Sequence, residues 1–353
     1  MMKKFKFLKQ IVLLILVMMF VLTGCKSDQS ASNDATRAVT GDAYESAVFD
    51  REKVEGKMAV YYLTSGLSIS TWLNQTAGGD AMIIIMPDGT TAMLDCGHQG
   101  EGAHALNRLK QLGIDKLDYF IVSHPHTDHI GGFSIIARHV DIGRVYMPPT
   151  EVMERADVVA KDFIAELEEK NIPYTHLAAG DVVELSKDVT MKVYNPDPGF
   201  GSNTKINLNE SSLLTKFIYK DSSYLMNGDI ANNGTSEKFN FATEDYLVAK
   251  YGEELKADVS KIGHHGNADS MSSMEWRETV GAKIYTTLTT FPRDVGEHNK
   301  NIEAGGISLN TALDGDFVIY TDGDGTYDVQ VSKDRASMEY EVLDTKDGYM
   351  HVE

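Results

Sequence analysis

Four side chains that can bind metal ions fall within six positions of the chain, in the segment HPHTDH at 124–129. His124 and His126 are two residues apart behind an apolar, strand-like run. Alternate side chains of extended backbone point the same way, so both imidazoles can face one ion. Asp128 and His129 follow about one turn later and can serve a second ion. Imidazole and carboxylate ligands suit Zn²⁺, and Mn²⁺ and Fe²⁺ also accept them, so the spacing predicts a metal-binding site.

A pair of metal ions at this position would favour hydrolysis. Two ions roughly 3.5–4 Å apart lower the pKa of a water molecule between them and neutralise charge on a phosphoryl or carbonyl oxygen. The other nucleophiles are weaker candidates: Ser123 has no visible triad, and Cys96 fits a small buried hydrophobe better than a reactive thiolate. We therefore expect a metal-activated hydroxide to be the nucleophile.

Strand-like and helix-like segments alternate along the chain and would position these residues. The apolar runs that indicate strands include 81–86, 91–97, 117–123, 212–229 and 258–266. Such interleaving predicts an α/β fold in which β-sheet packs between helices. No change in composition divides the stretch 56–335, so we expect a single domain there.

HPHTDH resembles the H-x-H-x-D-H signature of the metallo-β-lactamase superfamily. Supporting motifs stand in the family's order over residues 58–332, namely LDCG at 94–97, LMNGD at 225–229 and HHG at 264–266. The resemblance implies an αββα sandwich that holds two divalent metal ions between its two sheets, with zinc expected and manganese or iron as alternatives.

The resemblance also implies which residues hold the ions. The two histidines at the start of HPHTDH would bind the first ion, the aspartate and last histidine the second, and Asp229 would bridge both. His265 would complete the second site, with His264 as the competing candidate because the sequence does not decide which of the pair turns inward. The implied metal ligands are His124, His126, Asp128, His129, Asp229, His265 and His264, of which Asp128 and Asp229 are also the catalytic candidates.

One departure from the family pattern concerns the first ion. Many members carry a further histidine before the bridging aspartate, but no histidine lies between His176 and Asp229. The region reads NLNESSLL at 207–214 and is similar to the C-terminal domain of ComEC-type DNA-uptake proteins. Teichoic-acid phosphorylcholine esterases look like relatives too. The missing histidine argues against a β-lactamase and leaves the occupancy of the first site open.

Five further polar residues are weaker candidates. Asn209 and Ser212 would contact substrate oxygens or else form a turn. His98 would donate a proton to a leaving group or else be a solvated loop histidine. Asp80 and Asp95 are expected near the metals in a supporting position.

The N-terminal residues resemble an export signal. Lysines at the start, the apolar run 11–22 and the motif LTGC at 22–25 are similar to a bacterial lipobox, which implies lipidation of Cys25. The alternative is an uncleaved anchor. The predicted division is 1–24 signal peptide, 25–55 lipid-anchored flexible linker, 56–335 hydrolase domain and 336–353 C-terminal tail. The protein is then expected at the outer face of the bacterial cell membrane.

The net charge of −19 gives an acidic surface, which repels the phosphate backbone of nucleic acids. The expected function is still a metal-dependent phosphodiesterase, either a ComEC-like nuclease or a phosphorylcholine or teichoic-acid esterase. The alternatives are a non-catalytic metal-containing surface protein and a lactone or amide hydrolase. Expected partners are a phosphodiester substrate, which is a nucleic acid or a cell-wall polymer, and the membrane through the lipid on Cys25. No protein partner is predicted.

Overall fold

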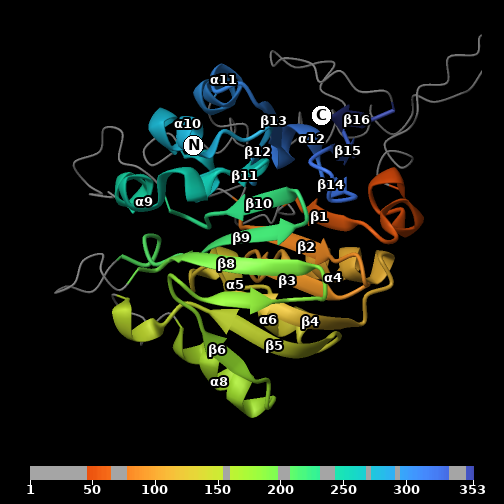
Figure 1. The fold of residues 1–353 in the computed structure, drawn as a ribbon. Coiled ribbons are helices and arrows are strands. Elements are labelled where there is room, and N and C mark those ends of the chain that lie inside the picture. The colour runs from red at the N-terminus through yellow and green to blue at the C-terminus, as the bar shows by residue number, and fades with distance from the viewer. Residues whose placement is uncertain are drawn as a thin grey trace, which may run out of the picture. The chain divides into compact units, whose positions relative to one another are not determined.

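A computed structural model describes residues 46–64, 78–153, 160–197, 207–230, 243–267, 272–290, 295–333 and 347–353. All of them belong to the second of two units into which the chain divides, Val39–Glu353. Two β-sheets and the helices beside them make up the described part of this unit (Figure 1). None of its helices is long and apolar enough to cross a membrane.

The first sheet has nine strands among the described residues, in the order β16-β15-β14-β1-β2-β3-β4-β5-β6. Their bounds are β1 (Met58–Tyr62), β2 (Ala81–Ile85), β3 (Thr91–Cys96), β4 (Lys116–Ile121), β5 (Asp141–Met147), β6 (Tyr174–His176), β14 (Phe317–Thr321), β15 (Tyr327–Val331) and β16 (Tyr349–Val352). Strands β3 to β6 are parallel to one another, and the remaining pairs are antiparallel.

The second sheet has seven described strands in the order β13-β12-β11-β10-β9-β8-β7. Their bounds are β7 (Val182–Glu184), β8 (Val189–Asn195), β9 (Leu214–Tyr219), β10 (Ser222–Met226), β11 (Val259–Lys261), β12 (Ile284–Thr287) and β13 (Ile307–Asn310). Strands β10 to β13 are parallel and β7 to β10 antiparallel, so each sheet has a parallel and an antiparallel part.

Helices are distributed between the strands. The α-helices are α4 (Gly102–Gln111), α5 (Thr127–Ile130), α6 (Phe133–Ile136), α8 (Lys161–Glu169), α9 (Thr243–Tyr251), α10 (Met274–Val280), α11 (Val295–Glu303) and α12 (Thr311–Asp314). Short 3₁₀ turns are η1 (Arg51–Val54), η2 (Thr150–Val152), η3 (Gly252–Leu255) and η4 (Gly263–Gly266).

The largest apolar core lies between the two sheets. Side chains that alternate along β2, such as Met82 and Ile84, meet Val193 of β8 and Met226 of β10 there. The intervening residue Ile83 faces the other way and packs in a separate cluster with α4 and α6. Burial of both faces explains why β2 is a continuous apolar run without polar alternation.

Helices cover the outer face of each sheet. Leu109 of α4 and Phe133 of α6 pack on the first sheet. Leu247 of α9 and Trp276 of α10 pack with Leu225 on the second sheet. Burial of a side chain of this size stabilises a fold by about 1.5–3 kcal/mol. The order helix, sheet, sheet, helix confirms the predicted αββα sandwich.

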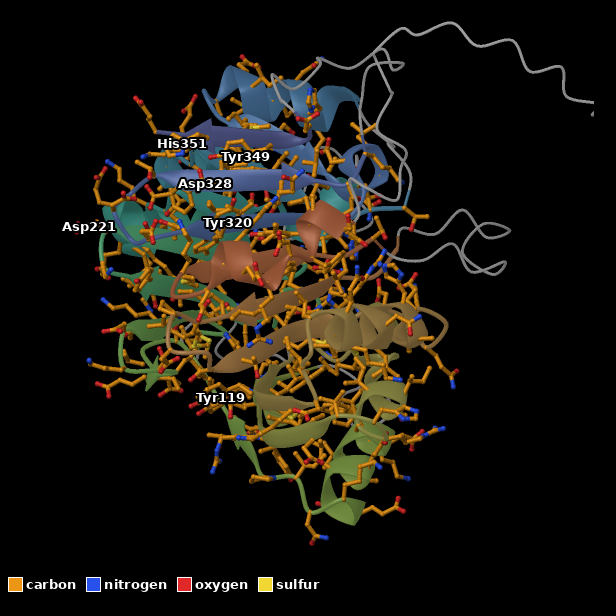
Figure 2. The ribbon with its side chains drawn as sticks, turned by 90° about the vertical axis from the view of Figure 1, so that its right-hand side faces the viewer. Tyr119, Asp221, Tyr320, Asp328, Tyr349 and His351 are labelled. Carbon is orange, nitrogen blue, oxygen red and sulfur yellow. The ribbon has the colours of Figure 1, made fainter. Side chains whose placement is uncertain are left out.

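The packed fold reaches beyond the predicted limits 56–335 on both sides. Val48 and Phe49 are buried against the outer layer of the first sheet. Near the other end, β16 pairs with β15, and its Tyr349 hydroxyl donates to Asp328 Oδ1 at 2.7 Å (Figure 2). The first segment buries Val48, Phe49 and Val54 and the second Met350 and Val352, and so few apolar residues are too little for a sequence pattern to reveal. The rest of the predicted division stays a prediction.

Candidate metal centre

Four polar motifs follow strands at one edge of the two sheets. LDCG ends β3 and HPHTDH follows β4, and these strands are parallel neighbours in the first sheet. NGD follows β10 and HHG follows β11, which are parallel neighbours in the second. Because the carboxyl ends of parallel strands lie at the same edge of a sheet, each sheet brings two motifs together there.

The backbone of HPHTDH changes from strand to helix within the motif. His126 has extended dihedral angles, φ −68° and ψ 153°, and α5 starts at Thr127. His124 and His126 therefore lie on extended chain, while Asp128 and His129 lie in the first turn of a short helix. The turn carries the second pair of side chains to a position beside the first.

The first cluster contains His124, His126 and Asp229. Its two ring nitrogens, His124 Nε2 and His126 Nδ1, are 2.8 Å apart. Asp229 Oδ2 lies 3.6 Å from His124 Nε2. All three ligand atoms are within 4.8 Å of one another, which is a spacing that one ion can bridge.

The second cluster contains Asp128, His129, His265 and the same Asp229. His265 Nε2 lies 3.4 Å from Asp128 Oδ2 and 3.6 Å from Asp229 Oδ1. His129 Nε2 is 3.3 Å from Asp229 Oδ2. Asp229 therefore faces both clusters, one carboxylate between two groups of ligands.

The two adjacent histidines of the HHG motif differ in position. The side chain of His265 is 2% exposed and belongs to the second cluster. The side chain of His264 is 23% exposed, with Nε2 4.0 Å from Asp229 Oδ2 and 3.3 Å from Asn209 Nδ2. Both residues have a positive φ, near 50°, which few non-glycine residues adopt. Such backbone strain often marks functional loops.

Several atoms of the clusters are buried without a hydrogen-bond partner among the described protein groups, and they include His129 Nε2, His265 Nε2 and Asp229 Oδ1. A buried polar atom without a partner costs about 1–3 kcal/mol. These atoms converge, and they are nitrogen and carboxylate donors that divalent cations accept. The residues present therefore fit divalent metal ions.

Carboxylates behind the clusters fix two of the imidazole rings. His129 Nδ1 lies 2.8 Å from Asp95 Oδ2, and Asp95 Oδ1 accepts the backbone N–H of Ser123. His265 Nδ1 lies 3.1 Å from both Asp80 Oδ1 and the carbonyl oxygen of Leu288. Because these partners are acceptors, each Nδ1 carries a proton and each Nε2 is left to face the cluster. In the metal-free protein the nearby carboxylates, Asp229 first, outweigh burial and raise the pKa of His129 and His265, so each Nε2 holds a proton that an incoming cation would displace. Asp80 and Asp95 thus lie within hydrogen-bonding distance of two of the predicted metal ligands.

A buried lysine that the sequence analysis missed lies behind Asp80. Lys261 has no exposed surface, and its Nζ is 2.7 Å from Asp80 Oδ2. The ammonium also donates to the carbonyl oxygens of Gly228 and Ile262, at 2.7 and 3.1 Å. The only signal in the sequence is a lysine at the end of the buried strand VSK, which alone does not distinguish a buried residue from an exposed one.

The electrostatics of the clusters favour a bound cation. Burial lowers the pKa of His124 well below its ordinary value, so this ring is neutral and able to donate a lone pair. Burial alone would raise the pKa of Asp229, but the surrounding histidines, His129 first, hold that pKa well below the ordinary range. The bridging carboxylate is therefore ionised.

The weaker candidates take different positions. Asn209 lies beside His264 at the first cluster. Ser212 is fully buried, donates to the carbonyl oxygen of Asn209 and accepts the backbone N–H of Asp229, so its hydroxyl supports a loop and does not face a substrate. His98 is half-buried beside Gly97, and the described contacts do not join its ring to either cluster. Cys25 lies outside the described residues.

Cys96 has no role as a nucleophile. It is fully buried, its Sγ–H donates to the carbonyl oxygen of His129, and burial raises the pKa of the thiol well above its ordinary value.

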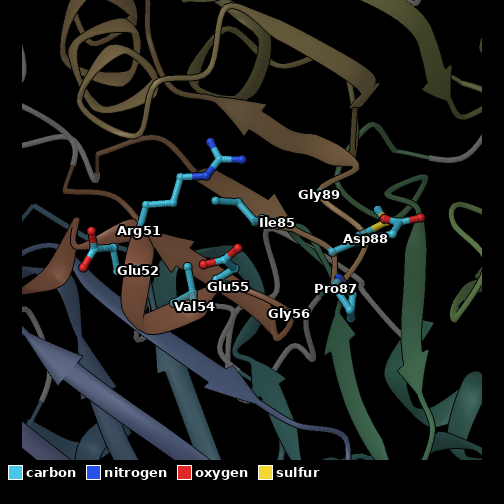
Figure 3. A pocket seen from close by; sticks show the side chains of 10 residues that line it. Arg51, Glu52, Val54, Glu55, Gly56, Ile85, Pro87, Asp88 and Gly89 are labelled. Carbon is cyan, nitrogen blue, oxygen red and sulfur yellow. The ribbon is translucent and has the colours of Figure 1, made fainter.

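A separate hollow lies at the turn between β2 and β3, at the opposite end of these strands from the clusters (Figure 3). Its lining residues are Arg51, Glu52, Val54, Glu55, Gly56, Ile85, Met86, Pro87, Asp88 and Gly89. The lining contains no histidine or cysteine, so it lacks the groups from which the metal chemistry is built.

Comparisons with known proteins find relatives that match parts of this chain. ComE operon protein 3 of Bacillus subtilis (strain 168) is 28% identical over 158 residues, which are 45% of this chain and 18% of that protein. Exodeoxyribonuclease YycJ of Bacillus anthracis is 30% identical over 77 residues, 22% of this chain and 28% of that protein. The chain thus spans less than a third of either relative's length. Competence protein ComA of Neisseria gonorrhoeae is 24% identical over 176 residues, 47% of this chain and 19% of that protein. Together with ComE operon protein 3, it confirms the resemblance to ComEC-type proteins.

Among solved structures, the metallo-beta-lactamase fold protein YhfI from Bacillus subtilis is similar, with a TM-score of 0.45 and 14% identity over 72% of this chain and 95% of that one. The model of the metallo-beta-lactamase superfamily matches residues 76–274, more than half of the chain. With the HPHTDH ligands and the αββα layers in place, this chain belongs to the metallo-β-lactamase superfamily.

Proposed function

We propose that the protein is a hydrolase that uses two divalent metal ions to cleave a phosphodiester bond. The observation that carries the proposal is the position of Asp229. Its carboxylate lies 3.6 Å from His124 Nε2 on one side and 3.6 Å from His265 Nε2 on the other. A shared carboxylate between two ligand groups is the arrangement that two-metal hydrolysis requires.

Each group of residues has a role in this proposal. His124 and His126 hold the first ion, the second cluster holds the other, and Asp229 holds both. When bound, two divalent ions make hydroxide available near neutral pH and neutralise charge on a phosphoryl oxygen. Asp95 and Asp80 keep the rings of His129 and His265 oriented toward the ions.

A phosphodiester is the proposed substrate for two reasons. One relative is by name an exodeoxyribonuclease, and another is by name a competence protein, ComA. Two ions also suit the charge of a phosphoryl group better than that of a neutral lactone or amide. A net charge of −19 favours a short phosphodiester over a long polyanion, because a polyanion is repelled.

The proposed location is the outer face of the bacterial membrane, with the protein anchored through a lipid on Cys25. The leader sequence with LTGC at 22–25 supports this proposal. Metabolic labelling with a radioactive fatty acid tests it: label should enter the parent protein and be absent from Cys25→Ser. Equal labelling of both proteins would contradict the anchor.

The function is tested with bis(p-nitrophenyl) phosphate. The full chain, purified in detergent and loaded with Zn²⁺ or Mn²⁺, should hydrolyse it, and Asp128→Ala should abolish turnover. Asp141→Ala, which removes an exposed aspartate at the start of β5, is the matched control and should keep full activity. An inert metal-loaded parent would overturn the phosphodiesterase proposal and leave lactone or amide hydrolysis, or metal-dependent binding without turnover.

A further inference from the structure

The first cluster has fewer donors than the second. Three side chains form it, His124, His126 and Asp229, whereas four form the second. Divalent metal sites in proteins usually have at least four ligands. No histidine between His176 and Asp229 is present to supply the fourth.

Asn209 lies beside this cluster. Its side chain lies close enough to His126 to favour the charged form of that imidazole and so to raise its pKa slightly, against the lowering by burial. Its Nδ2 is 3.3 Å from His264 Nε2. The residue is 8% exposed, and its Oδ1 is buried without a hydrogen-bond partner among the described protein groups. In this respect the amide oxygen of Asn209 is like the ligand atoms of the second cluster.

The loop holds Asn209 at a fixed position relative to Asp229. The backbone N–H of Asn209 donates to Asn207 Oδ1 at 2.9 Å. Ser212 Oγ donates to the Asn209 carbonyl oxygen at 2.7 Å and accepts the Asp229 backbone N–H at 3.1 Å. One hydroxyl therefore ties the Asn209 loop to the bridging carboxylate, which is the type of support that metal ligands receive in proteins.

We propose that Asn209 Oδ1 is the fourth protein ligand of the first metal ion, in the place where other family members carry a histidine. This inference rests on the proposed metal centre. The first site then has two imidazoles, one carboxylate and one neutral amide oxygen. The second has two imidazoles and two carboxylates, so it carries one more negative charge.

The two ions should consequently bind unequally. A neutral carbonyl oxygen attracts a cation less than a carboxylate does, and carbonyl oxygen suits Mn²⁺ better than it suits Zn²⁺. The second site is therefore the tighter one. The first site is weaker and discriminates less between Zn²⁺ and Mn²⁺ than a site with three histidines would.

Metal binding tests the proposal without reference to turnover. The metal-free full chain in detergent is titrated with Zn²⁺ and with Mn²⁺ by calorimetry, and bound Mn²⁺ is followed by electron paramagnetic resonance. The parent should bind two ions with distinct affinities. Asn209→Leu keeps the number and branching of the side-chain heavy atoms and removes the oxygen. It should lower the affinity of the weaker site by at least about tenfold and leave that of the tighter site unchanged. Asn209→His should strengthen Zn²⁺ at the weaker site by a similar factor.

The matched control is Asn267→Leu, which changes an asparagine just after the HHG motif. In this variant the affinities for both metal ions should stay at the parent values. Circular dichroism of the metal-free variants shows whether each is folded. A folded Asn209→Leu protein that binds both ions like the parent would overturn the assignment of Asn209. A parent that binds fewer than two ions would overturn the proposed metal centre itself, which is a different outcome.

Discussion

Lys261 and Asp80 form an ion pair 2.7 Å long with no exposed surface on either side chain, directly behind His265. Asp80 has a second partner in His265 Nδ1, 3.1 Å away. The lysine thus neutralises the carboxylate that orients a candidate metal ligand. It also reaches the carbonyl oxygen of Gly228, the residue before Asp229, and so connects the support of His265 to that of the bridging carboxylate.

Lys261→Met should destabilise the metal-free protein by about 3–5 kcal/mol, because it leaves Asp80 buried and without its counter-charge. It should also lower the affinity of the second metal site by about 10–100-fold, because His265 loses the support of Asp80. Urea unfolding of the metal-free protein measures the first effect, and metal titration the second.

The double variant Lys261→Met with Asp80→Asn is the control. It removes both charges, so it should recover part of the stability that the single variant loses. If Lys261→Met alone unfolds at the same urea concentration as the parent, the pair makes no net contribution and Asp80 needs no counter-charge.

Asp95→Asn should weaken metal binding by about 10–100-fold while the fold stays intact. Asp95 Oδ2 accepts the proton of His129 Nδ1, and an amide nitrogen at that position would favour the tautomer that carries its proton on Nε2, toward the metal. Asp95 has φ 55°, a backbone conformation that asparagine tolerates well, so the substitution adds little strain. ¹⁵N NMR of the histidine rings should show a lower pKa for His129 in the metal-free variant, because the Asp95 carboxylate that favours the charged ring is gone. An unchanged His129 spectrum would contradict the role of Asp95.

Glu244 should make the stability of the metal-free protein fall as the pH rises from about 4.5 to about 8. Burial raises the pKa of this fully buried carboxyl from 4.5 to about 8. In that window the folded protein keeps the proton and the unfolded chain releases it, so the free energy of unfolding falls by about 1.4 kcal/mol for each pH unit. Glu244→Gln should remove this contribution and be more stable than the parent at pH 8.

The measurement is urea unfolding of both proteins between pH 5 and pH 8, compared as a difference at each pH. Glu169→Gln, which changes an exposed glutamate at the end of α8, should give a pH-independent difference near zero. A constant difference for Glu244→Gln would mean that Glu244 keeps its ordinary pKa in the folded protein.

The sequence predicts the fold and much of the ligand group because the decisive residues are close together in the chain. His124 and His126 owe their relative position to one strand end, and Asp128 and His129 to one helical turn, so their spacing suffices. The αββα order follows from interleaved apolar segments. Asp229 comes from the second sheet, 100 residues after His129, and only the resemblance to the family motif predicted that it joins these ligands.

Other features depend on backbone geometry that residue types do not encode. His264 and His265 both have left-handed φ values, and their side chains point in different directions. No periodicity in the sequence predicts which of the two turns inward. The sequence left Ser212 open between a substrate contact and a turn residue, and in the structure two hydrogen bonds to backbone take up its hydroxyl. Lys261 is hidden because its carboxylate partner, Asp80, comes from a distant segment of the other sheet.

Gly263→Ala should disrupt the centre although it adds only one methyl group. A Cβ at Gly263 would lie 1.7 Å from the carbonyl oxygen of Ile230, so the backbone after β10 and the start of the HHG loop must separate. This movement would pull Asp229 away from His265, and we expect the second ion to bind at least about tenfold more weakly. Gly252→Ala is the matched control: it has a positive φ of 47° but no atom within 4 Å of the added Cβ, so it should cost only about 1–2 kcal/mol and leave metal binding unchanged. Metal titration and urea unfolding of both variants separate the two effects. Equal metal affinities in the two variants would show that close backbone contact at Gly263 does not position the bridging carboxylate.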